Sequence, residues 1–440
     1  MPPHPPQDGE SSQYPFLSTK WVLVAVLFLV GMVNYGVRTS VAAIFPLLKT
    51  NLGFTDAGLG AIGSFFLWSY ALASPLAGHL GDRYDRSRIV LWSLIGWSVI
   101  TTACGLVHTE WELLVLRVLL GLVESLFLPA AMALVAEYHP EKTRATALGI
   151  MGVGQYLGLI GGATLVGFLA DRFGWRPSFW VLGVAGLAIA IPSYLLLPRS
   201  KLAAAGGQGE VAPPTNGSQV PFVKAFAELV KIPSFLVIAA AGALTAIGVW
   251  IFLNWLPLYF TEAFSLSLAS AGFWGASPIN AGGIAGQVLG GMASDRVARK
   301  GTQYRMVLQA VLILASAPIL LVFVGTKSLA LILVALTLNS FLRVAGDINM
   351  LPLLCDLAGP DRFAIAFGVT NMVNCLAGGL GIFVAGFLKS SWGLSGAFAG
   401  IVGILVLDSL VLLFGYRAFL KRDLDKAALQ SAHENPLAKS

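Results

Sequence analysis

The sequence predicts an all-α membrane protein with twelve transmembrane helices, arranged as two six-helix bundles with both termini in the cytoplasm. Of the 440 residues, 56% are hydrophobic and only 11% are charged, whereas soluble domains carry about 25% charged residues. The apolar runs are long and continuous, as membrane helices of roughly 20 residues require and the short alternating strands of a β-barrel do not. A polar stretch in the middle of the chain separates two sets of six runs.

Twelve apolar segments predict the helices in chain order. They span residues 20–46, 57–80, 88–107, 111–137, 144–170, 177–197, 234–261, 270–293, 304–324, 328–355, 364–388 and 395–418. The segments divide the chain into a disordered, Pro-rich N-terminal tail (1–19), a first bundle (20–197), a cytoplasmic linker (198–233), a second bundle (234–420) and a C-terminal tail (421–440). The first tail lacks the short apolar core and cleavage site of a signal peptide.

The basic residues predict the orientation of these helices. If the N-terminus is cytoplasmic, most of the 28 Lys and Arg residues fall in cytoplasmic loops and tails. Cytoplasmic loops of membrane proteins carry this excess of positive charge. The net charge of +6 is therefore a topology signal, and we expect no nucleic-acid partner.

The two predicted bundles repeat a loop pattern. Gly78, Asp82 and Arg83 follow the second helix with the spacing that Gly291, Asp295 and Arg296 show after the eighth. Internal duplication of this kind is expected of transporters whose halves rock about a central site.

These residues resemble the major facilitator superfamily. The pattern Gly78-x-x-x-Asp82-Arg83-x-x-Arg86-x-Arg88 is similar to that family's loop motif between helices two and three, although Asp85 stands where the family usually has Gly. The resemblance covers about residues 20–420 and implies a secondary transporter with the major facilitator fold.

Two groups within the superfamily are similar to this chain. The chain resembles the anion:cation symporters, which include sugar-acid carriers, at Asn34–Arg38, Arg117 with Glu124, Gln155, and Asn371 with Asn374. It also resembles the spinster-like lysolipid carriers, in the stretches Gly78–Asp85 and Leu169–Trp180.

Charged residues inside the predicted helices indicate where function lies, because an Arg or Asp at the centre of a membrane helix is unfavourable by about 2.5–3.5 kcal/mol. Arg117 and Glu124 lie two turns apart on one face of the fourth helix, and Arg38 lies in the first. We expect Arg38 to bind the anionic group of a substrate, Glu124 to carry a coupling proton and Arg117 to set its charge state. The alternative is a structural ion network. Bacterial symporters of this group often have Asp before the first-helix Arg, where this chain has Val37, so exchange or equilibration of anions without protons stays open.

The second half has its own buried charges. Arg343 and Asp347 are spaced to pair along one helix, and Arg343 precedes Asp356 as Glu124 precedes Glu137, which favours a cavity position. A substrate role and a self-contained pair are equally open. Asp408 stands alone in the twelfth helix, where we expect a polar contact between helices.

Five uncharged polar residues are further candidates for substrate contacts, with hydrogen bonding between helices as the alternative: Tyr70, Gln155, Asn254, Asn371 and Asn374. The three cysteines lack metal-ligand spacing, and no metal site or cofactor is expected. For the loop motifs we expect a role in gating, in which contacts between the halves stabilise the outward-open state. The gating candidates are Asp82, Arg83, Arg86, Arg144, Asp295 and Arg296.

Together these features predict a monomeric secondary transporter, not an enzyme, in the inner (plasma) membrane of a bacterium. Its expected partners are a small organic anion, such as a sugar acid, protons and the lipid bilayer. A spinster-like carrier of lysolipids or other amphiphiles is the main alternative.

Overall fold

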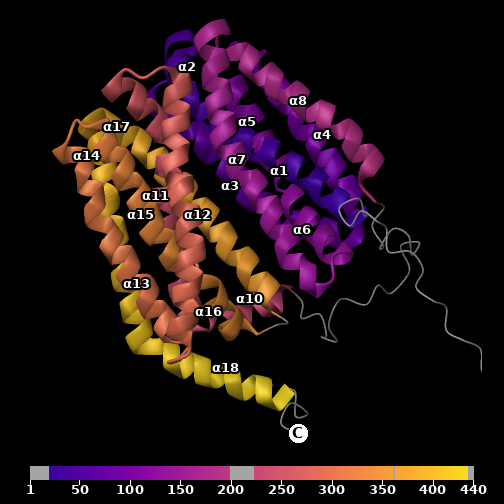
Figure 1. Cartoon of the computed structure of the whole chain (residues 1–440), viewed down its shortest axis with the longest axis vertical. Helices are drawn as coiled ribbons and strands as arrows, with labels where there is room; N and C mark the ends of the chain where they lie inside the picture. Colours follow the sequence, from indigo (N-terminus) through magenta and orange to yellow (C-terminus); the bar gives the residue numbers. More distant parts are fainter. Residues whose placement is uncertain (1–18, 199–221, 360–361, 435–440) are drawn as a thin grey trace, which may run out of the picture.

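The computed structural model describes residues 19–198, 222–359 and 362–434, and in these ranges it contains helices and turns but no strand. The first set of helices, coloured indigo to magenta, lies on the right of Figure 1. Its members are α1 (Thr19–Ala43), α2 (Phe45–Leu52), α3 (Asp56–Arg83), α4 (Arg86–Cys104), α5 (Glu110–Glu124), α6 (Phe127–Tyr138), α7 (Glu141–Phe173) and α8 (Trp175–Leu196).

The second set of helices, coloured salmon to yellow, lies on the left of Figure 1. Its α-helices are α10 (Phe222–Val230), α11 (Pro233–Phe264), α12 (Leu268–Ala298), α13 (Tyr304–Ser316), α14 (Val322–Gly325), α15 (Leu329–Asp347), α16 (Met350–Ala358), α17 (Phe363–Gly415) and α18 (Lys421–Glu434). A 3₁₀ turn, η2 (Ala317–Leu321), and a π-helical turn, η3 (Tyr416–Leu420), complete this set.

Ten helices of the described chain are long and apolar enough to cross a membrane, which confirms an all-α membrane protein. The 31-residue α12 is not among them, because Gly, Ser and Asn dilute its apolar character. The 53-residue α17 contains one non-helical residue, Gly393 at φ 66°, which lies between the predicted segments 364–388 and 395–418. The count of twelve crossings, the cytoplasmic termini and the domain boundaries stay predictions. Nearly all of the predicted tail (1–19) and most of the predicted linker (198–233) lie outside the described residues.

Two predicted helices are broken in the same way. The fourth is divided into α5 and α6, and the tenth into α15 and α16. Pro129 and Pro352 lack the amide hydrogen that would bond to the fourth residue back, so each helix loses one bond across its break. Glu124 is the last residue of α5, and Asp347 is the last residue of α15. Each half therefore places one acid at the end of its broken helix, five residues before the proline.

Glycines allow the helices within each half to approach closely. A side chain added at Gly162 of α7 would overlap Gly36 of α1, and one added at Gly158 would overlap the carbonyl of Met32. In the other half, Gly286 of α12 packs in the same manner on the backbone of α15 at Phe341. Small residues at such contacts let membrane helices pack backbone to backbone, since lipid supplies no hydrophobic force between helices.

The two halves meet where α3 packs against α17 and α7 against α12. We call the end that carries α2, at the top of Figure 1, the α2 end, and the opposite end, with α10, α16 and α18, the α18 end. The buried side chain of Asp423 ties α18 to the start of α11, where it accepts hydrogen bonds from the amide and hydroxyl of Ser234 at 3.1 and 2.8 Å.

Candidate functional site

An ion pair lies inside the first half, between α1 and the end of α5. The Nε of Arg38 is 2.9 Å from Oε2 of Glu124. Arg38 is 8% exposed and Glu124 is 0% exposed. Removing one partner of such a buried pair would leave an uncompensated charge, so each residue depends on the other.

Aromatic rings hold the guanidinium of Arg38 in place. Its central carbon lies 4.6 Å from the ring centroids of both Tyr35 and Tyr70, and 5.6 Å from that of Phe66. Cations within about 6 Å of a ring face are attracted to it. Tyr70, predicted as a substrate contact, therefore lies against the arginine predicted to bind the anion.

Arg117 is the second arginine of this cluster and is 1% exposed. Its guanidinium carbon lies 4.9 Å from the Phe66 ring. Its Nε and Nη1, like Nη2 of Arg38 and Oε1 of Glu124, have no hydrogen-bond partner among the described residues. The sequence analysis placed Arg117 and Glu124 on one helix face, but the ion pair of Glu124 forms with Arg38. Two arginines and one glutamate leave an excess positive charge and unfilled donors, which is suitable chemistry for an anion.

The predicted uncharged contacts are spread over both halves. Gln155 on α7 is partly buried and faces Gly31 of α1. Asn254 donates to the Trp250 carbonyl of its own helix at 3.0 Å, so one of its two donors is already used. Asn371 and Asn374 are partly buried on α17, and Oδ1 of Asn374 has no partner in the described part of the chain. A substrate role for all four stays a prediction.

The second half brings together the other buried charges. Nη1 of Arg343 is 2.8 Å from Oδ2 of Asp347, so the pair expected along this helix is present. Thr245 on α11 donates to Oδ2 of Asp408 on α17 at 2.7 Å. The polar contact expected between Asp408 and a neighbouring helix is thus present in the structure.

The gating candidates at the α18 end form bonds inside each half. Arg86 pairs with Glu137 at 3.0 Å, and Arg144 donates to the Ala136 carbonyl at 3.1 Å. In the second half, Asp295 is 3.6 Å from Arg305. Arg296 is exposed, and the side chains of Asp82 and Arg83 lie outside the described residues. Each of these bonds lies within one half.

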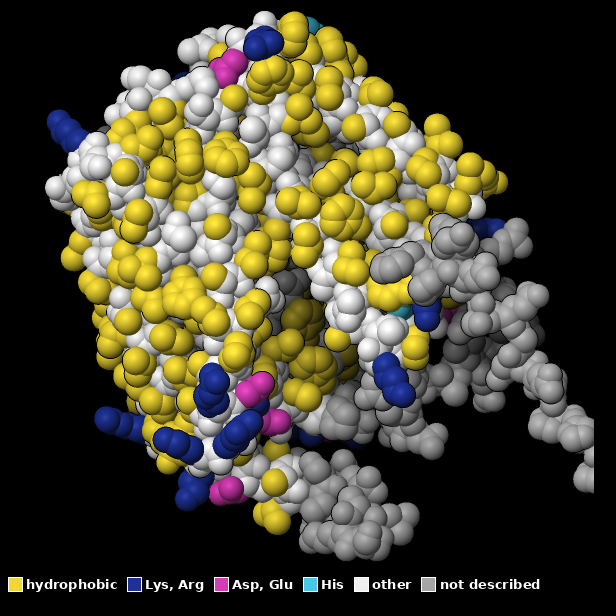
Figure 2. Space-filling view, in the orientation of Figure 1, with side chains coloured by type: hydrophobic (Ala, Val, Ile, Leu, Met, Phe, Trp, Pro, Cys, Tyr) yellow, Lys and Arg dark blue, Asp and Glu magenta, His cyan; other side chains and the backbone are white. Residues whose placement is uncertain are grey.

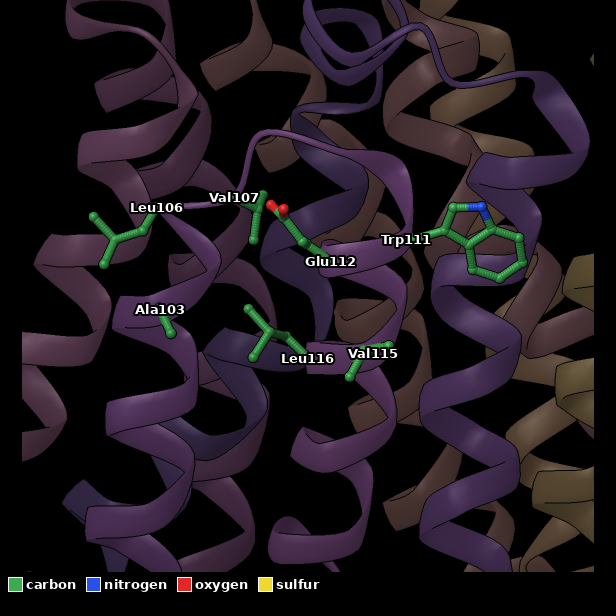
Figure 3. A pocket seen from close by; sticks show the side chains of 7 residues that line it. All are labelled: Ala103, Leu106, Val107, Trp111, Glu112, Val115 and Leu116. Carbon is green, nitrogen blue, oxygen red and sulfur yellow. The ribbon is translucent and has the colours of Figure 1, made fainter.

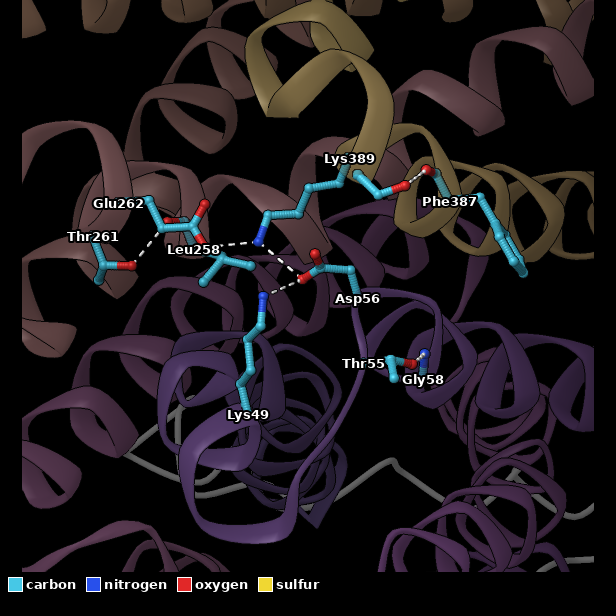
Figure 4. Close-up of polar contacts among 10 residues, drawn as sticks. Lys49, Thr55, Asp56, Gly58, Leu258, Thr261, Glu262, Phe387 and Lys389 are labelled. Carbon is cyan, nitrogen blue, oxygen red and sulfur yellow. Dashed lines mark hydrogen bonds and ion pairs between the residues drawn. The ribbon is translucent and has the colours of Figure 1, made fainter.

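A four-charge cluster connects the halves at the α2 end (Figure 4). Lys389 of α17 lies 2.9 Å from Asp56 of α3 and 2.7 Å from Glu262 of α11. Lys49 of α2 also pairs with Asp56 at 2.9 Å, and that hydrogen bond raises the pKa of Lys49. Sequence reasoning missed this cluster. The sequence signal that could have revealed it is the presence of basic and acidic residues at helix ends on the same predicted side of the membrane.

Further bonds close the seams between the halves. Asp171 at the end of α7 accepts from the amides of Leu268 and Ala269, both at 3.0 Å, and so caps the start of α12. An acid at a helix N-terminus bonds the free amides there and is favoured by the helix dipole. Along the other seam, Ser64 and Trp68 of α3 donate to backbone carbonyls of α17 at 2.7 and 3.0 Å.

Toward the α18 end the halves separate. Tyr156 of α7 still contacts the exposed Gln287 of α12, where its hydroxyl donates to Oε1 at 3.5 Å, but side chains added at Gly149 or Gly368 would meet open space. Figure 2 shows the surface hollowed between the halves in the lower part of the view. The structure is therefore closed at the α2 end and open at the α18 end.

An apolar groove of about 500 Å³ lies on the outside of the first half, between α4 and α5 (Figure 3). Leu106, Trp111 and Val115 line it and are well exposed. The carboxylate of Glu112 is occupied as a helix cap by the His108 amide at 2.7 Å. This groove suits lipid chains and is separate from the buried charges.

Two helical halves, closed together at one end and parted at the other around buried charges, define an integral membrane transporter of the alternating-access class. The chain belongs to the Major Facilitator Superfamily, whose family model matches residues 27–382. It is a transporter and not an enzyme.

Several relatives of this chain are named as sugar-acid transporters. It is 27% identical to the probable galactarate/D-glucarate transporter GudP of Bacillus subtilis, over 90% of this chain and 92% of that protein. It is 28% identical to the hexuronate transporter of the same organism, over 96% of this chain and all of that protein. The fold is similar to a bacterial homologue of the human lysosomal transporter Spinster in an inward-facing conformation, with a TM-score of 0.80, 21% identity and coverage of 92% and 98% of the two chains. The resemblance to organic-anion carriers and to spinster-like structures is confirmed.

Proposed function

We propose that this protein moves a small sugar acid across the plasma membrane together with protons. One observation carries the proposal: Arg38 and Arg117 are buried with unfilled donors beside a single glutamate. An arginine fork matches a carboxylate in two-point contact. The excess positive charge is therefore available to a substrate anion.

Proton coupling follows from competition for Arg38. In the structure, Glu124 occupies Nε of that arginine. A substrate carboxylate that displaces Glu124 would leave the glutamate buried without a cation. Burying an unpaired charge is costly, and such a group takes up a proton instead. Substrate binding would then require a proton on Glu124, which links the two fluxes.

The choice of a sugar acid draws on the relatives and on the polar residues predicted to contact the substrate. Galactarate, glucarate and hexuronates are named for three of the relatives. Such substrates carry many hydroxyls, which need hydrogen-bond partners. Gln155, Asn371 and Asn374 could supply these partners from both halves as the cavity closes.

Uptake by proteoliposomes tests this function. Vesicles containing the full-length protein are supplied with labelled glucarate or glucuronate, with and without an imposed pH gradient. We expect saturable uptake that accumulates substrate only with the gradient. Saturable uptake that merely equilibrates would identify an exchanger or uniporter, as Val37 allows. No uptake of any sugar acid would refute the proposal.

An amphiphile carrier is the second candidate, favoured by one surface feature. A groove of about 460 Å³ follows the seam between α7 and α12 and is lined by apolar side chains, including Leu165, Phe168 and Phe273. Such a groove suits an acyl chain. Competition by lysophospholipid against labelled glucuronate, measured in the same vesicles, would distinguish the two substrates.

A further inference from the structure

Asp408 is the most deeply buried acid among the described residues of the second half. It lies on α17 after the break at Gly393, is 0% exposed, and no lysine or arginine lies within ion-pair distance of it in the described part of the chain. Its Oδ2 accepts the Thr245 hydroxyl at 2.7 Å. Its Oδ1 has no partner among the described residues.

A carboxylate in this position is best explained as protonated. Ionised groups without a partner are strongly disfavoured in an apolar interior and neutralise instead. A neutral carboxyl also fits the contacts, because the bond between Oδ2 and the Thr245 hydroxyl can form in either direction when Asp408 is protonated. Among the titratable groups facing Asp408, Arg343 and Asp347 of α15 are close enough to interact electrostatically with it.

Asp347 has the opposite environment although it is near. Its carboxylate is paired with Arg343 at 2.8 Å, and its side chain is 28% exposed. Its carboxyl group is therefore accessible from outside the packed helices. The Thr245 hydroxyl bonds to Asp408 and is also within interaction range of Asp347. A hydroxyl can both accept and donate a proton.

We propose that Asp408 is a second proton-carrying group of this transporter, loaded from the cavity through Asp347 and the hydroxyl of Thr245. In the loading step, a protonated Asp347 gives its proton to Oγ1 of Thr245, and the hydroxyl proton passes to Oδ2 of Asp408. Asp347 returns to its charged form and re-forms the pair with Arg343. This inference deepens the proton coupling proposed above and moves part of it into the second half.

Infrared spectroscopy of the purified full-length protein tests the proton directly, without any substrate. We expect a band from a protonated carboxyl at neutral pH that Asp408→Asn removes and that disappears from the wild type as the pH is raised. Thr245→Val should keep the band but slow its response to a pH jump. A spectrum unchanged by Asp408→Asn, or a band that no pH removes, would overturn the proposal.

Transport separates a proton carrier from a neutral structural acid. With labelled glucuronate, Asp408→Asn should lose accumulation driven by the pH gradient while keeping exchange between equal concentrations. Ser409→Ala is the matched control, because Ser409 is equally buried and donates to the Ala310 carbonyl at 2.9 Å. Full gradient-driven accumulation by Asp408→Asn would also overturn the proposal. If the wild type transports no sugar acid, the function proposed above fails, while the infrared result still decides the state of Asp408.

Discussion

The two halves of the molecule share one architecture but differ in the charge at their centres. The first half holds Arg38 and Arg117 with a single acid, Glu124. The second half holds one arginine, Arg343, with the acids Asp347 and Asp408. Each half ends a broken helix on an acid, so the difference lies in what surrounds that acid. One centre has an arginine to spare, and the other has a carboxyl group to spare.

This difference indicates that the two halves of a duplicated fold can take different roles in coupled transport. An anion is attracted to the half with excess arginine, and protons are attracted to the half with excess carboxylate. The following predictions test this division.

The largest effect is expected for Arg38→Ala. It removes the cation that the substrate would bind and leaves Glu124 buried alone. Truncating one member of a buried, hydrogen-bonded charge pair costs about 2–5 kcal/mol, so glucuronate uptake should fall about 30-fold or more. Arg343→Ala, the comparison variant, loses a pair that is partly exposed and should fall far less. Equal losses in initial uptake rate would contradict the assignment of the anion to the first half.

The next effect concerns coupling. Glu124→Gln keeps the size of the side chain but can no longer change charge, so uptake should become independent of the pH gradient while exchange continues. Asp347→Asn at the equivalent helix end should slow gradient-driven accumulation without abolishing it. Initial rates and final levels measured at several gradients check both. Accumulation by Glu124→Gln at the wild-type level would show that the proton travels elsewhere.

A smaller effect is expected on stability. Arg117 is buried with two unfilled donors, and a buried charge without a compensating partner is unfavourable. Arg117→Met should therefore raise the thermal unfolding midpoint in detergent by a few degrees while lowering transport. Arg38→Met is the control and should lower the midpoint, because it leaves Glu124 buried without its cationic partner. A lower midpoint for Arg117→Met would mean that Arg117 braces the bundle.

The smallest effect is expected at the contact between the halves. Lys389→Ala removes the largely buried side chain that joins Asp56 to Glu262. Both acids are at least partly exposed, and ion pairs that water reaches contribute about 0.2–1 kcal/mol each. The population open at the α2 end should rise about fivefold. Thiol labelling of Ala57→Cys, in a background without the native cysteines, measures that population. Lys49→Ala breaks a pair within the first half and should change labelling little; equal effects would exclude Lys389 as a latch.

Much of this architecture could be predicted from the sequence. Apolar runs gave the order of the membrane helices, and the intramembrane charges pointed to Arg38, Arg117 and Glu124. The partner of Glu124 could not be read from spacing, because the pair with Arg38 depends on how α1 packs against α5. Similarly, spacing aligned Arg343 with Glu124, whereas the helix breaks at Pro129 and Pro352 make Asp347 the equivalent residue.

The contacts between the halves were harder to foresee. Lys389 and Asp56 are separated by most of the chain, and their meeting depends on which end of the molecule is closed. A sequence encodes all states of a transport cycle together, so it does not indicate which charges touch in one of them. The cap that Asp171 provides for α12 is hidden for the same reason.

The anchoring of α18 has a practical consequence for protein engineering. Asp423 fills the hydrogen bonds of Ser234 at the first turn of α11, so this helix is part of the second half and not a removable tail. Fluorescent reporters or affinity tags belong after residue 434. Truncation at residue 420 would uncap α11 and lower the yield of folded protein in the membrane.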